Sequence, residues 1–369
     1  MTSGALQGLR AIEMGQLIAG PYCGQLMGDH GAEVIKIEAP GTGDAIRKWG
    51  QGAPVWFSVI GRNKKSITLN LREKEGQDIA RQLIAKSDFL IENFRPGTIE
   101  KWGMDYETLS TSNPGLIMVR VSGYGQTGPY AARAGYGSIG EAMGGMRHVA
   151  GEPDRPPSRA GISIGDSLAA TYACLGAMMA LHHRHLTGKG QVVDSAIYEA
   201  VLANMESTVP EYAATGHIRE RTGSILPGLA PSNVYPTKDG DVLVAGNQDS
   251  VWKRLAAMMG MGELAIDPRF ATHDARGANQ KQLDGIIAAW TQTLSSQEIL
   301  DLCEKHGVPA GPIYRAPEML ADPHFAAREA LVKVDHPEYE NFMMQNVAPK
   351  LSATPGRIEA IGPDLGAHN

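Results

Sequence analysis

One acidic side chain stands where a short apolar segment meets a long helical pattern. Asp166 follows Gly165 in the run Ile-Ser-Ile-Gly-Asp-Ser of residues 162–167. Beyond it, larger apolar residues recur at the spacing of a packed amphipathic helix, at Leu168, Tyr172, Leu175 and Met179. An Asp at a helix entrance can serve as an N-cap, although the capping-box position 169 is Ala. A carboxylate beside a glycine, which lets a thioester come close, can instead be the nucleophile of an acyl transfer. The residue types alone leave both roles open.

The cysteines and histidines do not form a metal-binding pattern. Cys23, Cys174 and Cys303 are far apart and make no CxxC pair, so we expect neither a disulfide framework nor a zinc site. Such cysteine usage is typical of a reducing compartment. The histidine cluster of residues 182–185 falls at a helix end, where adjacent side chains point in different directions. We therefore predict no bound metal.

The composition is typical of a globular protein with room for a large and a small domain. The chain has 369 residues, of which 43% are hydrophobic and 20% charged. A net charge of −6 and the lack of a long basic tract argue against nucleic-acid binding. The first nine residues lack a signal-peptide pattern, and no 18 apolar residues run without a charge. We expect a cytoplasmic protein without a membrane span.

Strands and helices alternate along the first half of the chain. Strands are predicted at 9–15, 32–38, 65–71, 89–94, 116–122 and 192–194, and helices at 21–30, 73–86, 138–146 and 198–212. This alternation predicts a parallel sheet, whose ligands bind at the carboxyl ends of the strands, where Asn93 and Phe94 fall. Between Gly15 and Gly20 there is no G-x-G-x-x-G pattern, so NAD binding is not expected.

A smaller unit is predicted in the second half of the chain. Residues 223–228 are rich in Pro and Gly and mark a linker. A hairpin turning at Asp239-Gly240 follows, then helices near 249–260, 278–293 and 296–306 and a strand at 309–314. The predicted division is 1–200 for the large domain, 201–230 for a connecting helix and linker, 231–322 for a small α/β domain, and 323–369 for a return segment.

A set of motifs extends through this framework in a fixed order. They are residues 17–22, 32–44 with Arg47, Gly165-Asp166-Ser167 with its helix, and 186–194. In these motifs, and from Leu9 to His368, the chain resembles the class III CoA-transferases, the family of formyl-CoA transferase and carnitine CoA-transferase. The resemblance implies an α/β fold with a Rossmann-like large domain, a parallel sheet, a small α/β domain and an interlocked homodimer.

The same resemblance implies a mechanism and a CoA site. Asp166 would be the nucleophile, forming a mixed anhydride and then an aspartyl-CoA thioester. CoA and acyl-CoA would be substrates, and no prosthetic group or metal would be needed. The residues matching the family's CoA site are Leu17, Ile18, Leu69, Arg72, Asn93, Phe94 and Lys101, to which we add Tyr136. Phe94 would lie against the adenine, and Arg72 and Lys101 would meet phosphates. Ala39 stands where formyl-CoA transferase has Arg, so phosphate binding must depend more on other groups.

Two alternatives accompany this interpretation. An α-methylacyl-CoA racemase of the same fold carries a His after Ala-Gly, where this chain has Tyr136, and a phenol is a poor base at pH 7. A non-catalytic CoA-binding protein would bind acyl-CoA without turnover.

Residues 153–159 and 219–223 resemble the branch that acts on succinyl-CoA with malate or citramalate, so we expect a C4–C5 dicarboxylate. Formyl or oxalate transfer is disfavoured, because the Gln of that branch is Ile18 here. The candidate cations for a second carboxylate are Arg147, Arg159, Arg219 and Arg221.

Overall fold

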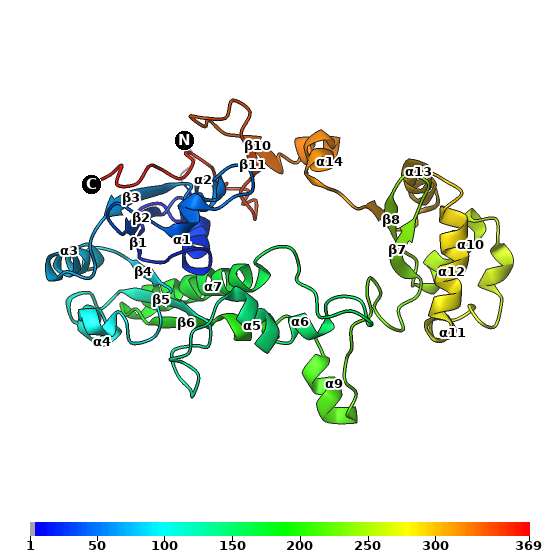
Figure 1. Ribbon diagram of the computed structural model, residues 1–369, viewed down its shortest axis with the longest axis horizontal. Coiled ribbons are helices and arrows are strands. Elements are labelled where there is room, and N and C mark those ends of the chain that lie inside the picture. Colours follow the sequence, from blue (N-terminus) through cyan, green and yellow to red (C-terminus); the bar gives the residue numbers. More distant parts are fainter. Residues whose placement is uncertain (1–3) are drawn as a thin grey trace. The chain divides into compact units, whose positions relative to one another are not determined.

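The chain passes back and forth between two structural units (Figure 1). The computed structural model describes residues 4–369. The first unit holds the residues up to Arg147, Ala160–Ile218 and Pro323–Asn369. The second holds His148–Arg159 and Arg219–Asp322. Asp166 and all eight residues predicted for CoA binding belong to the first unit.

A six-stranded parallel sheet forms the centre of the first unit. Its order is β3-β2-β1-β4-β5-β6. The strands are β1 (Arg10–Glu13), β2 (Glu33–Glu38), β3 (Lys64–Thr68), β4 (Phe89–Glu92), β5 (Ile117–Ser122) and β6 (Val192–Ala196). This is the doubly wound order of Rossmann folds. The chain adds β2 and β3 on one side of β1 and then returns to add β4, β5 and β6 on the other side, so the order reverses between β1 and β4. The predicted Rossmann-like α/β fold is confirmed.

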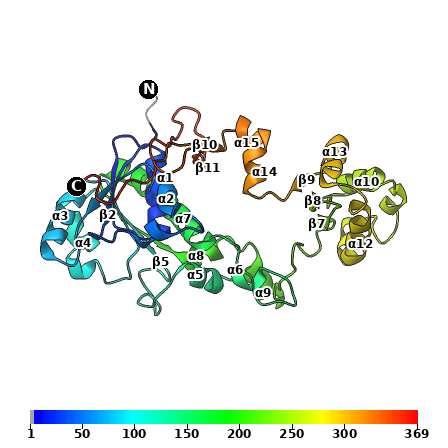
Figure 2. The same ribbon diagram turned by 45° about the horizontal axis from the view of Figure 1, so that its top comes forward.

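Helices cover both faces of this sheet (Figure 2). Successive strand residues point to opposite faces, and both sets are buried, as Ile117 and Val119 on one face and Met118 on the other show. Helices α1 (Ala19–Asp29) and α7 (Ile164–Thr187) cover one face, and α3 (Lys74–Ile84) and α4 (Tyr106–Ser112) the other. The remaining short elements before α7 are η1 (Ala45–Lys48), α2 (Trp56–Ile60), η2 (Glu100–Trp102), α5 (Gly137–Met143) and α6 (Met146–Val149).

Helix α7 was predicted from four large apolar residues, of which Leu168 packs against the core beside the sheet and the other three are exposed. The buried face is made of alanines, all with no exposed area: Ala169, Ala170, Ala173, Ala177 and Ala180. Tyr172, Leu175 and Met179 are 39%, 49% and 62% exposed. Small side chains let the helix axis approach the sheet and α1 closely, which excludes the larger residues from that side. The helix is long and apolar enough to cross a membrane by length and composition, a test that core helices of soluble proteins also pass.

The predicted connecting helix at 198–212 is interrupted. The structure has α8 (Ile197–Leu202) and α9 (Thr208–Thr215), separated by a turn in which Glu206 has a φ of 50°. Left-handed backbone cannot continue an α-helix, so the two pieces end and begin there. Helix α8 packs against both α5 and α7 beside the sheet.

The second unit is built on a three-stranded antiparallel sheet, β7-β8-β9. Its strands are β7 (Ser232–Pro236), β8 (Asp241–Ala245) and β9 (Ala310–Pro312), and the predicted hairpin at Asp239-Gly240 joins the first two. The helices are α10 (Asp249–Met258), η3 (Gly262–Ala265), α11 (His273–Ala278), α12 (Gln280–Thr291), α13 (Ser296–His306) and α14 (Ala316–Ala321). The predicted helix at 278–293 therefore starts two residues later, because α11 ends at Ala278.

After Asp322 the chain continues in the first unit. This return segment contains α15 (Pro323–Ala327), the antiparallel pair β10 (Leu331–Lys333) and β11 (Met343–Gln345), and an irregular tail. The tail lies along the edge strand β3: Ser66 N donates to His368 Nδ1 at 3.2 Å and Thr68 N to Asn369 Oδ1 at 2.7 Å. These bonds occupy the open side of the sheet edge.

Candidate active site

The loop after β1 and the end of β4 meet at the reversal point of the sheet. Asn93 holds the loop from the β4 side, since its Oδ1 accepts from Gln16 N at 2.8 Å and its Nδ2 donates to Gln16 O at 2.9 Å. A Cβ on Gly15 would lie 3.1 Å from the Gly20 Cα and 3.3 Å from Asn93 Oδ1. The loop therefore closes tightly around the Asn93 amide, at the edge where ligands of open α/β sheets bind.

Leu17 is held in an uncommon backbone conformation in this loop. Its φ is 62°, and its N–H donates to Asp44 Oδ1 and Oδ2 at 3.0 and 3.1 Å. Ile18 follows at the entrance of α1 and is 8% exposed. A non-glycine residue persists at positive φ only where its surroundings hold it, and such residues cluster at ligand-binding sites.

Buried charges beneath the loop fix its other backbone groups. Lys36 Nζ lies 2.8 Å from Glu13 Oε1, 3.0 Å from Asp44 Oδ2 and 2.7 Å from the Gly15 carbonyl oxygen. Lys64 Nζ lies 2.7 Å from Glu13 Oε2 and 2.6 Å from the Pro21 carbonyl oxygen. All four charged side chains are at most 1% exposed. The sequence analysis missed this network; its signal was charged residues inside otherwise apolar buried strands.

The protonation of the network follows from its pairing. Burial alone would raise the pKa of Glu13, but Lys36 and Lys64 outweigh it and hold that pKa below its ordinary value. Burial opposes the charge on Lys36, yet Glu13 and Asp44 raise its pKa. For Lys64 burial prevails and lowers the pKa. Lys36, which meets two carboxylates, is thus the better-stabilised cation.

A second buried pair supports Phe94. The Phe94 N–H donates to Glu92 Oε2 at 2.7 Å, and Glu92 Oε1 accepts from Arg120 Nε at 2.7 Å. Arg120 also pairs with Glu100 at 2.8 Å, which ties η2 to the strand ends. The Phe94 ring meets Trp102 edge-on, with ring centroids 5.2 Å apart. Burial raises the pKa of Glu92 despite the nearby Arg120.

The other predicted CoA residues surround this edge. Leu69 N donates to Glu38 O at 3.0 Å just beyond β3, and its side chain packs on the same apolar cluster as Phe94. Arg72 and Lys101 are exposed, on the segments that follow β3 and β4. Tyr136 is separate from them: it is the N-cap residue of α5 and is 65% exposed.

Asp166 is the third residue of α7 and not its N-cap. The N-cap is Ser163, which makes no side-chain capping bond. The Asp166 carboxylate is partly buried and lies against Gly137, the first residue of α5: a Cβ there would be 2.6 Å from Asp166 Cγ. The carboxylate thus occupies space that only a glycine leaves open. Sequence reasoning did not identify Gly137.

A buried ion pair adjoins the same turn of α7. Glu141, whose side chain is 2% exposed, faces Gly165, and its Oε1 lies 3.4 Å from the Gly165 N. Its Oε2 accepts from Arg147 Nε at 2.9 Å. The other three candidate arginines, Arg159, Arg219 and Arg221, lie in the second unit.

Comparison with known proteins decides the family. The family model described as CoA-transferase family III matches residues 6–369. The chain belongs to this family. It is 58% identical over 369 residues to succinyl-CoA–D-citramalate CoA-transferase of Chloroflexus aurantiacus, covering 99% of this chain and 92% of that protein. It is 41% identical to the succinyl-CoA–L-malate CoA-transferase beta subunit of the same organism, covering 98% and 92%.

A solved structure supports the same assignment. The crystal structure of a CaiB/BaiF family protein from Brucella suis matches with a TM-score of 0.89 and 35% identity, over 99% of this chain and 97% of that one. The protein is therefore an enzyme, a CoA-transferase that uses acyl-CoA as substrate.

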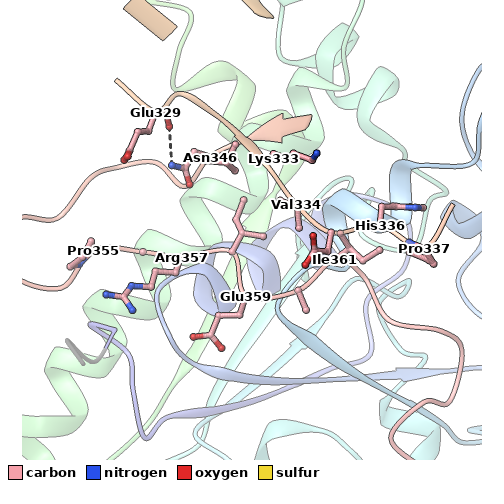
Figure 3. Close-up of a pocket in the computed structure, with 15 residues that line it drawn as sticks. Glu329, Lys333, Val334, His336, Pro337, Asn346, Pro355, Arg357, Glu359 and Ile361 are labelled. Carbon is pink, nitrogen blue, oxygen red and sulfur yellow. Dashed lines mark hydrogen bonds between the residues drawn. The ribbon is translucent and has the colours of Figure 1, made fainter. Parts of the chain in front are cut away.

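The CoA-transferase also has a cavity of about 920 Å³ in the return segment of its first unit (Figure 3). The lining residues come from 329–337, Asn346 and 355–361, and Asn346 Nδ2 donates to Glu329 O at 2.8 Å. None of the residues predicted for catalysis or CoA binding lines it. Within residues 4–369 no group of three or more His, Cys, Asp or Glu could hold a metal ion.

Proposed function

We propose that this enzyme transfers CoA from succinyl-CoA to a C4–C5 dicarboxylate such as citramalate or malate, with Asp166 as the nucleophile. The observation that carries the proposal is the position of the Asp166 carboxylate, in the first turn of α7 against Gly137. The names of the two relatives, which act on succinyl-CoA with citramalate and malate, support the substrate class.

The reaction needs no proton transfer. The Asp166 carboxylate attacks the thioester carbon, the C–S bond breaks, and CoA leaves as thiolate from a mixed anhydride. The thiolate attacks the aspartyl carbonyl, which releases succinate and leaves an aspartyl-CoA thioester. The acceptor carboxylate attacks that carbonyl and displaces CoA thiolate, which then takes the acyl group from the second anhydride and frees Asp166. The amino-terminal turn of α7, with its positive end of the helix dipole, favours the anionic intermediates.

We place the CoA site of this proposal at the edge of the sheet. In this proposal Leu17, Ile18 and Leu69 form apolar walls, and the Phe94 ring lies against the adenine. Asn93 acts through the loop that it holds, and the exposed cations Arg72 and Lys101 meet phosphate oxygens. Tyr136, directly before Gly137, would contact the CoA chain near the thioester.

We also propose the interlocked homodimer that the family resemblance implies, in a cytoplasmic enzyme. The outer face of α7 supports an association, because Leu175, Met179 and Leu186 are 49%, 62% and 74% exposed. Large apolar side chains gathered on one face are typical of an interface. Light scattering should give twice the chain mass of 39.4 kDa; a monomer at micromolar concentration would contradict this part.

A panel of acyl-CoA donors and carboxylic acids, read by mass spectrometry for new CoA esters, tests the function. Wild type should make citramalyl- or malyl-CoA from succinyl-CoA, and Asp166→Asn should make none while still binding CoA. Proton exchange at the α-carbon of a methylacyl-CoA without transfer would indicate a racemase, and binding without turnover a non-catalytic protein.

Trapping the intermediate tests the nucleophile itself. With donor alone, hydroxylamine should modify Asp166, and peptide mapping should find the label there. The label on a cysteine would overturn the assignment; burial raises the pKa of Cys303 to about 11, which disfavours its thiolate.

A further inference from the structure

We propose that Arg147, oriented by Glu141, binds the second carboxylate of the dicarboxylic substrate. This inference deepens the proposed function and rests on it. The family comparison and the relatives' names do not assign a carboxylate-binding residue, and the sequence offered four candidate arginines without distinguishing them.

Arg147 is linked to the turn of α7 that carries the nucleophile. Gly165, the residue before Asp166, packs against α5: a Cβ on it would lie 3.0 Å from Gly137 O and 3.1 Å from Glu141 Cγ. Glu141 and Gly137 are four residues apart and so share one face of α5. The face that supports the Asp166 carboxylate therefore also carries Glu141, and Arg147 is bonded to Glu141.

A C4 dicarboxylate is short enough to require a cation close to the nucleophile. Three short links connect Asp166 to the guanidinium: the peptide bond to Gly165, the 3.4 Å contact between Gly165 N and Glu141 Oε1, and the 2.9 Å hydrogen bond between Glu141 Oε2 and Arg147 Nε. A succinyl chain separates its two carboxyl carbons by three C–C bonds of about 1.5 Å each. A dicarboxylate of this length therefore needs its cation close to the nucleophile, and Arg147 is linked to the turn of Asp166 through Glu141 and Gly165.

Glu141 orients the guanidinium of Arg147. Glu141 holds Arg147 through Nε, and neither Nη atom of Arg147 donates a hydrogen bond to a residue of 4–369. The side chain is 25% exposed, while Glu141 is 2% exposed. A guanidinium anchored at Nε keeps its two Nη groups for a bidentate bond to a carboxylate. A carboxylate that orients a binding residue from behind is the usual way in which a site is made rigid.

Other partly or fully buried arginines of the first unit use at least one Nη group in a bond or ion pair. Arg47 donates to Pro363 O and Glu38, Arg62 to Gln345 O and Asp29, and Arg120 pairs through Nη2 with Glu100. In the second unit, Arg221 Nη1 donates to His148 O at 2.8 Å. Of these arginines, Arg147 is the one whose bonding leaves a pair of donors for a ligand.

The test compares two donors that differ only in the distal group. Succinyl-CoA ends in a carboxylate, and butyryl-CoA, whose acyl chain has the same number of carbons, ends in a methyl group. Arg147→Met should lower kcat/KM for succinyl-CoA at least about 30-fold more than for butyryl-CoA, because a substrate carboxylate loses its partner. Arg147→Lys, which keeps the charge but loses the bidentate bond, should recover part of this ratio. Glu141→Gln should also reduce the ratio, since the guanidinium loses its orientation.

Arg184→Met is the matched control. Arg184 is also an ion-paired arginine of the first unit. It belongs to the last turn of α7, at the opposite end of the helix from Asp166. Its side chain is 16% exposed, and its Nη1 lies 2.9 Å from Asp88 Oδ1. Its substitution should leave the donor ratio unchanged.

Equal losses for both donors in Arg147→Met and Arg147→Lys would overturn the inference and make the pair a support of the fold. If Arg147→Met does not fold, the ratios in Arg147→Lys and Glu141→Gln decide in the same way. A wild-type enzyme that transfers CoA to no dicarboxylate would instead overturn the proposed function.

Discussion

Replacing Gly137 by Ala tests directly whether the position of the Asp166 carboxylate matters for transfer. The new Cβ would lie 2.6 Å from Asp166 Cγ and 3.0 Å from Oδ1. Carbon atoms in contact are about 3.5–4.0 Å apart, so the carboxylate must retreat by about 1 Å. A displacement of about 1 Å at a reacting group can cost about 100-fold in rate, or roughly 2.7 kcal/mol of transition-state stabilisation.

The same substitution should leave the fold almost unchanged. Gly137 is the first residue of α5 and is not at positive φ. Ala is favoured over Gly in helices by up to about 1 kcal/mol, and Asp166 can yield by rotating its side chain. We therefore expect kcat to fall about 100-fold, while the urea midpoint stays within experimental error or rises.

A helical glycine with open space around it provides the control. A Cβ on Gly285 of α12 would meet no atom within 4 Å, so Gly285→Ala should keep full activity. Both variants are measured for succinyl-CoA-dependent transfer, for CoA binding by calorimetry and for urea unfolding. If Gly137→Ala retains transfer within threefold of Gly285→Ala, the Asp166 carboxylate does not depend on this contact, and our account of the site is wrong.

Two further predictions concern the loop and the charges beneath it. Asp44→Asn weakens the hydrogen bond that the Leu17 N–H donates and removes the ion pair with Lys36. The KM for succinyl-CoA should therefore rise about tenfold, with a smaller change in kcat. A fall in kcat alone would show that the loop does not bind CoA. Glu38 is buried, which alone would raise its pKa, but hydrogen bonds from Arg47 and Ser66 lower that pKa below its ordinary 4.5. A carboxyl group whose pKa is lower in the folded protein than in the unfolded chain stabilises the fold above pH 4.5. This stabilisation is lost as the pH falls through the folded-state pKa. Glu38→Gln should therefore unfold at lower urea concentration at pH 7 yet lose less stability between about pH 5 and 3; an unchanged pH dependence would contradict the pairing.

Local patterns predicted much of the fold because they depend on neighbouring residues. The alternation of strand and helix patterns placed Asn93 and Phe94 at the carboxyl ends of the strands, and in the structure the loop that carries Leu17 meets Asn93 there. The hairpin at Asp239-Gly240 followed from its turn residues. The failures lay where tertiary packing prevails: the break between α8 and α9, and the face of α7 that is buried.

By itself, the sequence determined the family, a Rossmann-like α/β fold with a parallel sheet and the carboxylate that stands where α7 begins, because motif order and periodicity are properties of the chain. Only the tertiary structure decided how the site is held. Lys36 and Asp44 meet the loop after β1, and Lys64 meets the first turn of α1, because the strand order brings distant segments together. Burying a charge is costly unless a partner meets it, and partners far apart in sequence become visible only in the folded chain. For the same reason, only the fold placed Arg147 and Glu141 beside Asp166's helix and the other candidate arginines in the second unit.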